Sequence, residues 1–467
     1  MKFIKDLYGL SVILITFTFF TMPLKAQVTI GSQEAPKSFS ILELISTTGG
    51  LRLPQLSDQE LTDLTNNKLS TSDAKEAAKG LVIYNKTTNC LEFWNGDKWI
   101  SLCQSKLGDG SESDPYLVCS PESLDAMRDK PDAHYKLCQN IDLTDYLATG
   151  AGQSKWGGSG WLPIGDATTP FTGSLDGAGY TISGLWIQRP STGFGAIGLF
   201  GYINGGSLKN FSVKLDATKG INGGLNTYVG SVAGRLSGSG SSISNCYVNG
   251  GDLRGGNSVG GVAGRVDSGS SGVTCCYASV NVTGANGIGG VVGQISSDVT
   301  AERGGSVTNC FATGNIIGTT GVGGVVGRVQ ISGNVSYCYT TGAISRSAPN
   351  TNTNANYLGG VTGRIDNNGT VTNCIALNIS VTTTYGNGIG RITGNNSSGT
   401  LTNNWALSDM TITDGSGSPK TIINDAGDVD GADMNDTNSK TANWWTSVPG
   451  WDSSIWNFVN NQLPKLK

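Results

Sequence analysis

A phrase of about 30 residues recurs seven times between residues 197 and 406, and no other feature of the sequence restricts the fold as strongly. The third copy begins with VGGVAGR at 259–265 and ends with VTCCYA at 273–278. The second glycine of the phrase falls at residues 201, 234, 264, 293, 327, 363 and 394. This spacing is typical of one supersecondary unit copied end to end, with its length variation confined to loops.

Each copy contains two or three short alternating runs rich in Val, Ile, Thr and Tyr, separated by Gly, Asn and Ser. Such runs favour strands, and the copies show no helical periodicity. Short strands stacked copy on copy describe the coils of a parallel β-solenoid. We therefore predict an all-β fold, in which residues 198–413 form a right-handed parallel β-helix behind a small mixed α/β N-terminal domain.

Residues at one register of the copies should lie one above another in such a solenoid. One register holds mostly cysteine, and the register before it holds mostly asparagine, which tolerates a left-handed turn and can bond between coils. The register after it is mostly aromatic. Adjacent strand residues face opposite ways, so we expect the cysteines inside and the rings at least partly outside. These columns comprise Cys246, Cys276, Cys310, Cys338 and Cys374; Asn245, Asn309 and Asn373; and Tyr247, Tyr277, Phe311 and Tyr339.

The segments that flank the repeats are predicted to close the solenoid. Residues 107–197 should supply an N-terminal cap and the first coils, and residues 414–467 a C-terminal cap. Cys119 and Cys138 follow two predicted strands at the start and could form a disulfide, although parallel strands offer poorer geometry than a hairpin. An open far end would expose unpaired strand edges. We expect it to be plugged by Trp444, Trp445, Trp451 and Trp456.

The first 106 residues differ from the repeats. Residues 1–26 have the basic start, apolar run and small final residue of a secretory signal peptide, and no other segment is apolar and long enough to span a membrane. We therefore expect an exported protein, secreted or on the outer cell surface.

Residues 27–106 are predicted to form a leader domain, with a helix over 57–78 and a hairpin around Asn95–Gly96. The hairpin register places Trp94 opposite Trp99. It also places Cys90 opposite Cys103, close enough for a disulfide.

Several motifs resemble the GLUG repeats of bacterial surface proteins. They are GLFG at 198–201, GGVAG at 260–264 and TNCFATGN at 308–315, with similar lead-in and closing segments at 170–187 and 444–467. The leader domain resembles those of exported Bacteroidetes proteins. The resemblance implies a β-helical, adhesin-like exported protein. Some GLUG proteins are IgA-cleaving metallopeptidases, but this chain has one histidine and no HExxH motif.

Composition argues against catalysis. An enzyme on a β-helix would need clustered carboxylates, but the acidic residues of the repeats are scattered, and His134 precedes the repeats. The acidic run from Asp425 to Asp436 lacks the first and last ligands of an EF-hand loop, which favours a solvated loop. We predict no catalytic residues, metal or cofactor. A formal net charge of −4 argues against nucleic acid as a partner.

One further column follows the second glycine and consists of Arg235, Arg265, Arg328 and Arg364. Arginines side by side could hold an anionic glycan by bidentate hydrogen bonds, or they could shield an exposed sheet from aggregation. We take these arginines and the aromatic column as candidate ligand residues. The predicted function is non-catalytic, adhesin-like binding of a glycan or a host or matrix protein by a lateral face. The alternatives are a structural spacer or stalk and a polysaccharide-degrading β-helix enzyme.

Overall fold

The computed structural model describes residues 50–467 except 89, 103–107, 192, 194, 226–227, 268–271, 297–303, 347–356, 384–385, 387 and 416–417; before residue 50 it describes 28–30, 42–44 and 48. The predicted signal peptide and Cys103 lie outside the described residues, so the Cys90–Cys103 disulfide stays a prediction. The chain forms two compact units, residues 1–102 and 103–467.

The first unit contains a small mixed sheet with two helices, α2 (Asp58–Lys68) and α3 (Ser72–Ala77). The sheet has the strand order β3 (Gln55–Leu56), β4 (Val82–Asn85), β5 (Cys90–Trp94) and β6 (Trp99–Ser101). A separate parallel pair is made by β1 (Val28–Ile30) and β2 (Leu42–Leu44).

The predicted hairpin is present in this unit, and the segment predicted as a helix over 57–78 forms two helices separated at residues 69–71. Trp94 lies opposite Trp99, with ring centroids 5.6 Å apart, as the register predicted. The Trp94 ring is buried and its Nε1 donates a hydrogen bond to the Lys75 carbonyl of α3 at 2.9 Å. Helix α3 therefore contacts the hairpin through Trp94, and α2 contacts it through Thr65, whose Oγ1 accepts a hydrogen bond from Trp99 Nε1 at 3.1 Å.

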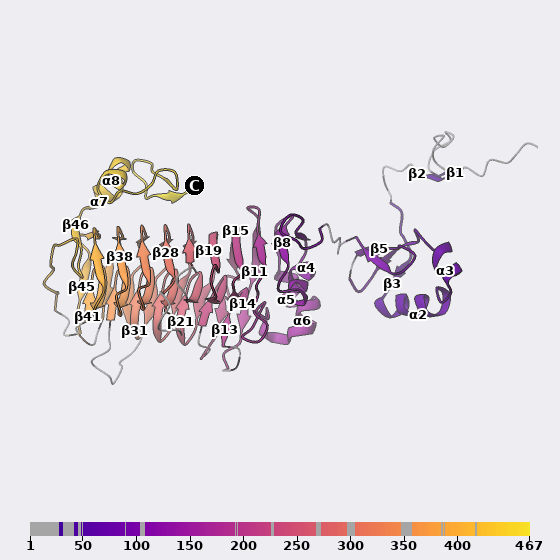
Figure 1. Cartoon of the computed structure of the whole chain (residues 1–467), viewed down its shortest axis with the longest axis horizontal. Coiled ribbons are helices and arrows are strands. Elements are labelled where there is room, and N and C mark those ends of the chain that lie inside the picture. Colours follow the sequence, from indigo (N-terminus) through magenta and orange to yellow (C-terminus); the bar gives the residue numbers. More distant parts are fainter. Residues whose placement is uncertain are drawn as a thin grey trace, which may run out of the picture. The chain divides into compact units, whose positions relative to one another are not determined.

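The second unit is a parallel β-solenoid, whose stacked coils follow one another along the horizontal axis of Figure 1. Most coils contribute strands to four sheets, the first of which is a bent sheet. The named strands pair in parallel from coil to coil. The bent sheet folds at the asparagine register, so most of its coils contribute two strands. It contains β7 (Tyr116–Val118), β8 (His134–Leu137), β9 (Ile141–Asp142), β10 (Ser174–Asp176), β11 (Thr181–Leu185), β15 (Ser207–Leu215), β19 (Ser242–Asn249), β23 (Gly272–Thr274), β24 (Tyr277–Ala278), β28 (Ser306–Thr308), β29 (Phe311–Ala312), β33 (Asn334–Ser336), β34 (Tyr339–Thr340), β38 (Thr370–Thr372), β39 (Ile375–Ala376), β43 (Thr400–Thr402), β44 (Trp405–Leu407) and β46 (Ala432–Met434).

The other three sheets follow the bent sheet in chain order, whereas the outermost strands β7, β8, β9 and β46 belong only to the bent sheet. The second sheet contains β12 (Ile187–Gln188), β16 (Ile221–Asn222), β20 (Asp252–Arg254), β25 (Asn281–Thr283), β30 (Ile316–Gly318), β35 (Ile344–Arg346), β40 (Ser380–Thr382) and β45 (Thr411–Thr413). The third contains β13 (Ala196–Ile197), β17 (Tyr228–Gly230), β21 (Asn257–Gly260), β26 (Asn286–Gly289), β31 (Thr320–Gly323), β36 (Tyr357–Gly359) and β41 (Gly388–Gly390). The fourth contains β14 (Phe200–Asn204), β18 (Ala233–Ser237), β22 (Ala263–Val266), β27 (Val292–Ile295), β32 (Val326–Val329), β37 (Thr362–Ile365) and β42 (Thr393–Asn396).

The repeated second glycine is required where the fourth sheet packs against the third. A Cβ added at Gly293 would lie 2.4 Å from the backbone of Val259, and one at Gly327 would lie 2.2 Å from the backbone of Ile288. Real Cβ atoms do not approach backbone so closely, so any larger residue would separate the two sheets. The phrase therefore keeps glycine at this register for close backbone approach.

The cysteine and asparagine columns occupy adjacent registers of the bent sheet, at the point where that sheet folds. Cys246, Cys276, Cys310, Cys338 and Cys374 are fully buried, and the Cys246 N–H donates to the Cys276 Sγ at 3.4 Å. The asparagine register has the left-handed backbone, with φ of 51° at Asn245, 55° at Asn309 and 54° at Asn373. Asparagine suits this conformation because its short side chain bonds locally.

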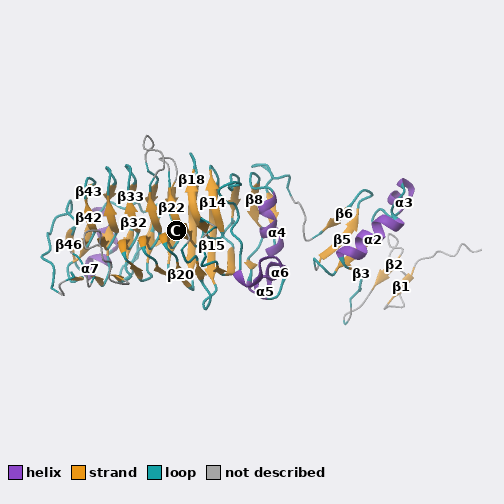
Figure 2. Ribbon diagram, turned by 90° about the horizontal axis from the view of Figure 1, so that it is seen from below, coloured by secondary structure: helices purple, strands orange, loops and turns teal. Residues whose placement is uncertain are grey.

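The N-terminal end of the solenoid is covered by short helices, which Figure 2 shows in purple beside β8. Cys119 and Cys138 follow the paired strands β7 and β8 directly and form a disulfide, with Cα atoms 5.2 Å apart. The helical elements are α4 (Pro121–Asp125), η1 (Ala126–Asp129), α5 (Thr144–Ala148), α6 (Ala151–Trp156) and η2 (Gly157–Ser159).

The C-terminal end differs from the prediction of a tryptophan plug. Strand β46 pairs with β44 and extends the bent sheet beyond the last repeat. The buried Arg391 side chain donates to the carbonyl oxygens of Asp430 and Gly431, both at 2.9 Å, beneath this segment. Ile422 and Val429 of the same segment pack against the core, so the end is closed by apolar side chains, backbone and charged groups rather than by tryptophans.

The tryptophans lie on the side of the solenoid instead. The segment from residue 436 to 467, which we call the C-terminal cover, contains α7 (Asp436–Ser439), α8 (Ala442–Ser447), β47 (Trp456–Asn457) and β48 (Lys465–Leu466). Figure 1 shows it (yellow) against one flank of the coils. Trp445, Trp451 and Trp456 pack with Phe311, Tyr339 and Ile375 in one buried cluster. The aromatic column supplies an apolar surface that the tryptophans bury, which explains the lateral position.

Candidate ligand-binding groove

The four predicted arginines form one column on the fourth sheet. Arg235 is in register with Arg265, and Arg328 is in register with Arg364. Gln294 occupies the coil between Arg265 and Arg328. Strand neighbours lie about 4.8 Å apart, so the column extends across about 19 Å from Arg235 to Arg364.

Two aspartates, which the sequence analysis did not identify, hold these arginines. Asp267 accepts hydrogen bonds from the Nε atoms of Arg235 and Arg265, at 2.6 and 2.5 Å. Asp366 does the same for Arg328 and Arg364, at 3.1 and 2.7 Å. Each aspartate follows an arginine by two residues, in RVD at 265–267 and RID at 364–366. That spacing places both side chains on one face of a strand and was visible in the sequence.

Two groups of this column, Asp366 and Arg265, have pKa values shifted in the direction that favours their charged forms. Burial alone would raise the pKa of the Asp366 carboxyl, but hydrogen bonds from Arg364, Ser397 and Arg328 outweigh it and hold the pKa below its ordinary value. Burial alone would lower the pKa of Arg265, but the neighbouring Asp267 carboxylate raises it above the ordinary value. Four arginines face two aspartates, so the column keeps a surplus of positive charge.

A second column lies on the adjacent third sheet. Tyrosines at its two ends form walls, and the residues between them are small. From Tyr228 the register continues through Ser258, Gly287 and Gly321 to Tyr357. The guanidinium carbon of Arg265 lies 5.3 Å from the centre of the Tyr228 ring, and that of Arg364 lies 5.0 Å from the centre of the Tyr357 ring. The two rings are therefore fixed against the ends of the arginine column.

Glycines form the floor between these walls. Gly287 and Gly321 have φ of +65° and +60°, and a Cβ at either would meet no atom closer than 3.4 Å. Their missing side chains leave a groove of about 400 Å³, which also contacts Asn257, Asn286 and Thr320. The Asn286 amide donates to Asn257 Oδ1 at 2.9 Å along the opposite rim. We call this the arginine groove; it combines guanidinium, aromatic and amide groups.

The aromatic column is divided into a covered and an accessible part. Its rings stack with centroids 4.8 Å apart from Tyr247 through Tyr277 and Phe311 to Tyr339. Phe311 and Tyr339 are only 9% and 2% exposed because the C-terminal cover packs on them. These two rings therefore are not available to a ligand, contrary to expectation, whereas Tyr247 and Tyr277 remain partly exposed.

The other side chains that could take part in catalysis or metal binding make hydrogen bonds to neighbouring residues. Asp430, from the acidic run, is buried and accepts hydrogen bonds from Lys420 Nζ at 2.7 and 2.9 Å. His134 Nδ1 lies 2.7 Å from Ser174 Oγ on the next strand, and among the described residues no carboxylate hydrogen-bonds its other ring nitrogen. The groups that triad chemistry would need are thus not assembled there.

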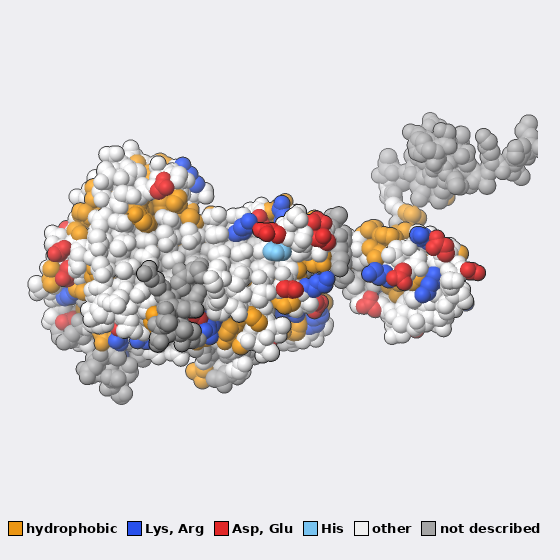
Figure 3. Space-filling model, viewed as in Figure 1, with side chains coloured by type: hydrophobic (Ala, Val, Ile, Leu, Met, Phe, Trp, Pro, Cys, Tyr) orange, Lys and Arg blue, Asp and Glu red, His pale blue; other side chains and the backbone are white. Residues whose placement is uncertain are grey.

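Figure 3 shows that the visible flank of the solenoid is mostly neither charged nor apolar. Within the described part of the chain, no group of three or more His, Cys, Asp or Glu is arranged to hold a metal ion. No helix there has the length and hydropathy needed to cross a bilayer.

These features define a parallel β-solenoid protein with a small α/β unit before it. Residues 29–114 match the family model "Phage tail like trimerisation region". A "Putative Gly-rich membrane protein" of Evansella cellulosilytica is 39% identical over 112 residues, which are 23% of this chain and 12% of that protein. "Halomucin" of Haloquadratum walsbyi is 35% identical over 165 residues, 34% of this chain and 2% of that protein. The chain therefore spans only a small part of these curated relatives, the first of which is a membrane protein by name.

One solved structure, of a "putative immunoglobulin A1 protease" from Bacteroides ovatus, aligns with a TM-score of 0.48 and 17% identity. The alignment covers 77% of this chain and 94% of that chain.

Proposed function

We propose that the chain is an exported, non-catalytic, adhesin-like surface protein that binds an acidic glycan lengthwise in the arginine groove. The observation that carries this proposal is that three arginines of the column, Arg265, Arg328 and Arg364, line the groove beside its glycine floor. A guanidinium recognises carboxylate or sulfate through paired hydrogen bonds.

The shape of the groove favours a chain-like ligand. Tyr228 and Tyr357 are four strand spacings apart, about 19 Å, and the three residues at the register positions between them, Ser258, Gly287 and Gly321, are small. A linear glycan could lie on Gly287 and Gly321 with its acidic groups toward Arg328 and Arg364, whose side chains are 37% and 31% exposed. The resemblance to GLUG surface repeats supports the same assignment.

Binding to oligosaccharides would test this proposal. We would titrate the full chain with a polyuronate, a heparin oligosaccharide and neutral dextran by calorimetry. The double variant Arg328→Ala/Arg364→Ala should bind the acidic oligosaccharide at least about tenfold more weakly, a loss of about 1.4 kcal/mol. Arg254→Ala is the matched control, because Arg254 is an exposed arginine on the second sheet that is paired with Asp252.

Two outcomes would contradict the proposal. Equal binding of dextran and the acidic oligosaccharides would show that charge does not determine binding. Unchanged binding by the double variant would show that the arginine groove is not the binding site. Shortening of the oligosaccharide during incubation would instead support the polysaccharide-degrading alternative.

We further propose that residues 29–114 assemble the chain into trimers, which the family match supports. A trimer would present three grooves, and linked sites raise the apparent affinity for a polymer. Light scattering should give the mass of three chains, and a monomeric mass would contradict the trimer. A trimer that binds no glycan would favour the structural spacer, the second candidate function.

A further inference from the structure

The exposed end of the aromatic column has the features of a second binding site. Tyr277 stacks on one face of the Tyr247 ring at a centroid distance of 4.8 Å. In the preceding two coils, the same register holds Ser212 and Thr181. Among the described residues, no aromatic ring stacks on the other face of Tyr247. The column of rings thus stops beside two small side chains.

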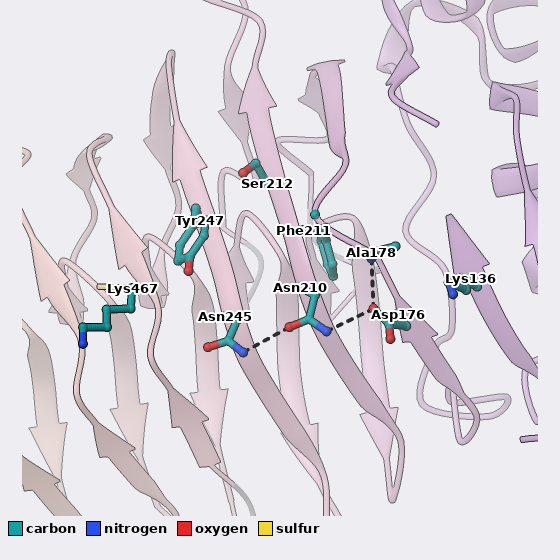
Figure 4. A pocket seen from close by; sticks show the side chains of 10 residues that line it. Lys136, Asp176, Ala178, Asn210, Phe211, Ser212, Asn245, Tyr247 and Lys467 are labelled. Carbon is teal, nitrogen blue, oxygen red and sulfur yellow. Dashed lines mark hydrogen bonds between the residues drawn. The ribbon is translucent and has the colours of Figure 1, made fainter. Parts of the chain in front are cut away.

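A pocket of about 450 Å³ lies at this point, in the bend of the sheet. Figure 4 shows Tyr247 on one side of it and a row of polar side chains along its floor. Asn245 donates to Asn210 Oδ1 at 3.0 Å, and Asn210 donates to Asp176 Oδ1 at 3.1 Å. Lys136 and Lys467 also line the pocket. One wall is therefore aromatic, and the floor carries acceptors and donors.

These groups match the chemistry of a sugar ring. The negative face of an aromatic ring attracts polarised C–H groups, which a pyranose presents on its flat side. Hydroxyls at the ring edge need both acceptors and donors, which Asp176 and Asn245 provide. Small-molecule sites commonly combine such an apolar wall with a few fixed polar groups. Since burial competes with bonds from the Ala178 N–H and Asn210, the net effect is a lowered pKa for Asp176, which keeps its carboxylate as an acceptor.

We propose that this pocket binds one pyranose ring, stacked on Tyr247 above Ser212 as the next ring of the column. The site goes beyond the arginine groove, because it lies on the bent sheet and uses none of the groove residues. Each site can therefore fail without the other.

The sharpest test fills the pocket with a ring from the protein itself. Ser212→Tyr places a tyrosine beside Tyr247, in the register at which aromatic rings stack on one another in the following coils. The fold should therefore accept this substitution. Ser212→Ala is the control that leaves the pocket open. We would record saturation-transfer NMR spectra of the full chain with the methyl glycosides of glucose, galactose and N-acetylglucosamine.

We expect saturation transfer to at least one methyl glycoside, strongest at the protons of one ring face. Ser212→Tyr and Tyr247→Ala should weaken binding at least about tenfold. Ser212→Ala, which leaves the pocket open, should weaken it less than Ser212→Tyr does, and Arg254→Ala, which lies in neither site, should leave it unchanged. A melting temperature for Ser212→Tyr close to that of the unmodified chain would show that the fold is intact.

Two results would overturn the proposal. The first is the absence of saturation transfer to all three glycosides at millimolar concentration. This result would overturn the proposal even if a planar probe such as indole binds. The second is unchanged glycoside binding by Ser212→Tyr.

Discussion

The aromatic column and the arginine column are built by the same repeat, yet the chain treats them differently. Phe311 and Tyr339 are covered by a segment that folds back over them, whereas the arginines are balanced within their own sheet by Asp267 and Asp366. Exposed apolar rows promote association, so they need a cover. A charged row needs only partial neutralisation and can remain open. This comparison separates the covered half of the aromatic column, which is structural, from the surfaces that stay open, namely the Tyr247 end of that column and the arginine column.

The largest expected effect comes from breaking the cover. Trp456 is 1% exposed and contacts Phe311, Tyr339 and Trp451, so Trp456→Ala leaves a cavity. We expect a loss of about 3–5 kcal/mol in the free energy of unfolding, measured in urea. Trp444→Ala is the control, because this residue is only partly buried and should lose less. A smaller loss at Trp456 than at Trp444 would contradict the covered column.

The next effect concerns the balance of charge in the arginine column. Asp267 is 6% exposed and bonds two arginines, so Asp267→Asn leaves both without their carboxylate. We expect a loss of about 2–3 kcal/mol in the free energy of unfolding, because breaking a buried pair strands its partner. Asp252→Asn breaks an exposed pair with Arg254 and should lose less than about 1 kcal/mol. Equal losses would show that the column is only a surface network.

The pH dependence should separate the two columns. Because folding lowers the pKa of Asp366, its carboxylate stabilises the fold at pH values above its ordinary pKa of 3.8. That contribution is lost as the pH falls through the lower pKa of the folded state. Asp366→Asn should therefore be less stable than the unmodified chain at pH 7, with the difference shrinking in acid. Trp456→Ala titrates no group, and its loss should persist; a pH-independent effect of Asp366→Asn would contradict this assignment.

The smallest effect concerns the asparagine column beside the rings. Cys275 interrupts it with φ of 53°, a conformation that suits asparagine better than cysteine. Cys275→Asn should raise the free energy of unfolding by about 1 kcal/mol, since left-handed backbone costs most residues about 1–2 kcal/mol. Ser244→Asn places the same residue in a neighbouring strand position and should not stabilise. Destabilisation by Cys275→Asn would show that the thiol has a packing role.

The repeat made much of this structure predictable. Because every coil pairs with the next in one register, the periodic positions alone aligned Arg265 with Arg235 and Asn309 with its neighbours in the column. The ion pairs could have been found from the RVD and RID spacing.

The C-terminal cover could not be placed in the same way. Trp456 bonds Asn309, 147 residues earlier, and no periodicity encodes a contact between a unique segment and a chosen coil. Hydrophobicity identified the tryptophans as a buried group, but either the end or the flank of the solenoid could have received them.

The C-terminal cover also affects how the chain folds. Coils in a solenoid contact only their neighbours, so they can form and melt one at a time. The Tyr339 hydroxyl bonds the Pro464 carbonyl, 125 residues away, and Trp451 donates to the Asn373 carbonyl. This segment can dock only when the coils that carry Asn309, Tyr339 and Asn373 are already stacked. It therefore links coils that would otherwise unfold independently into one cooperative unit, and its docking marks the completion of folding.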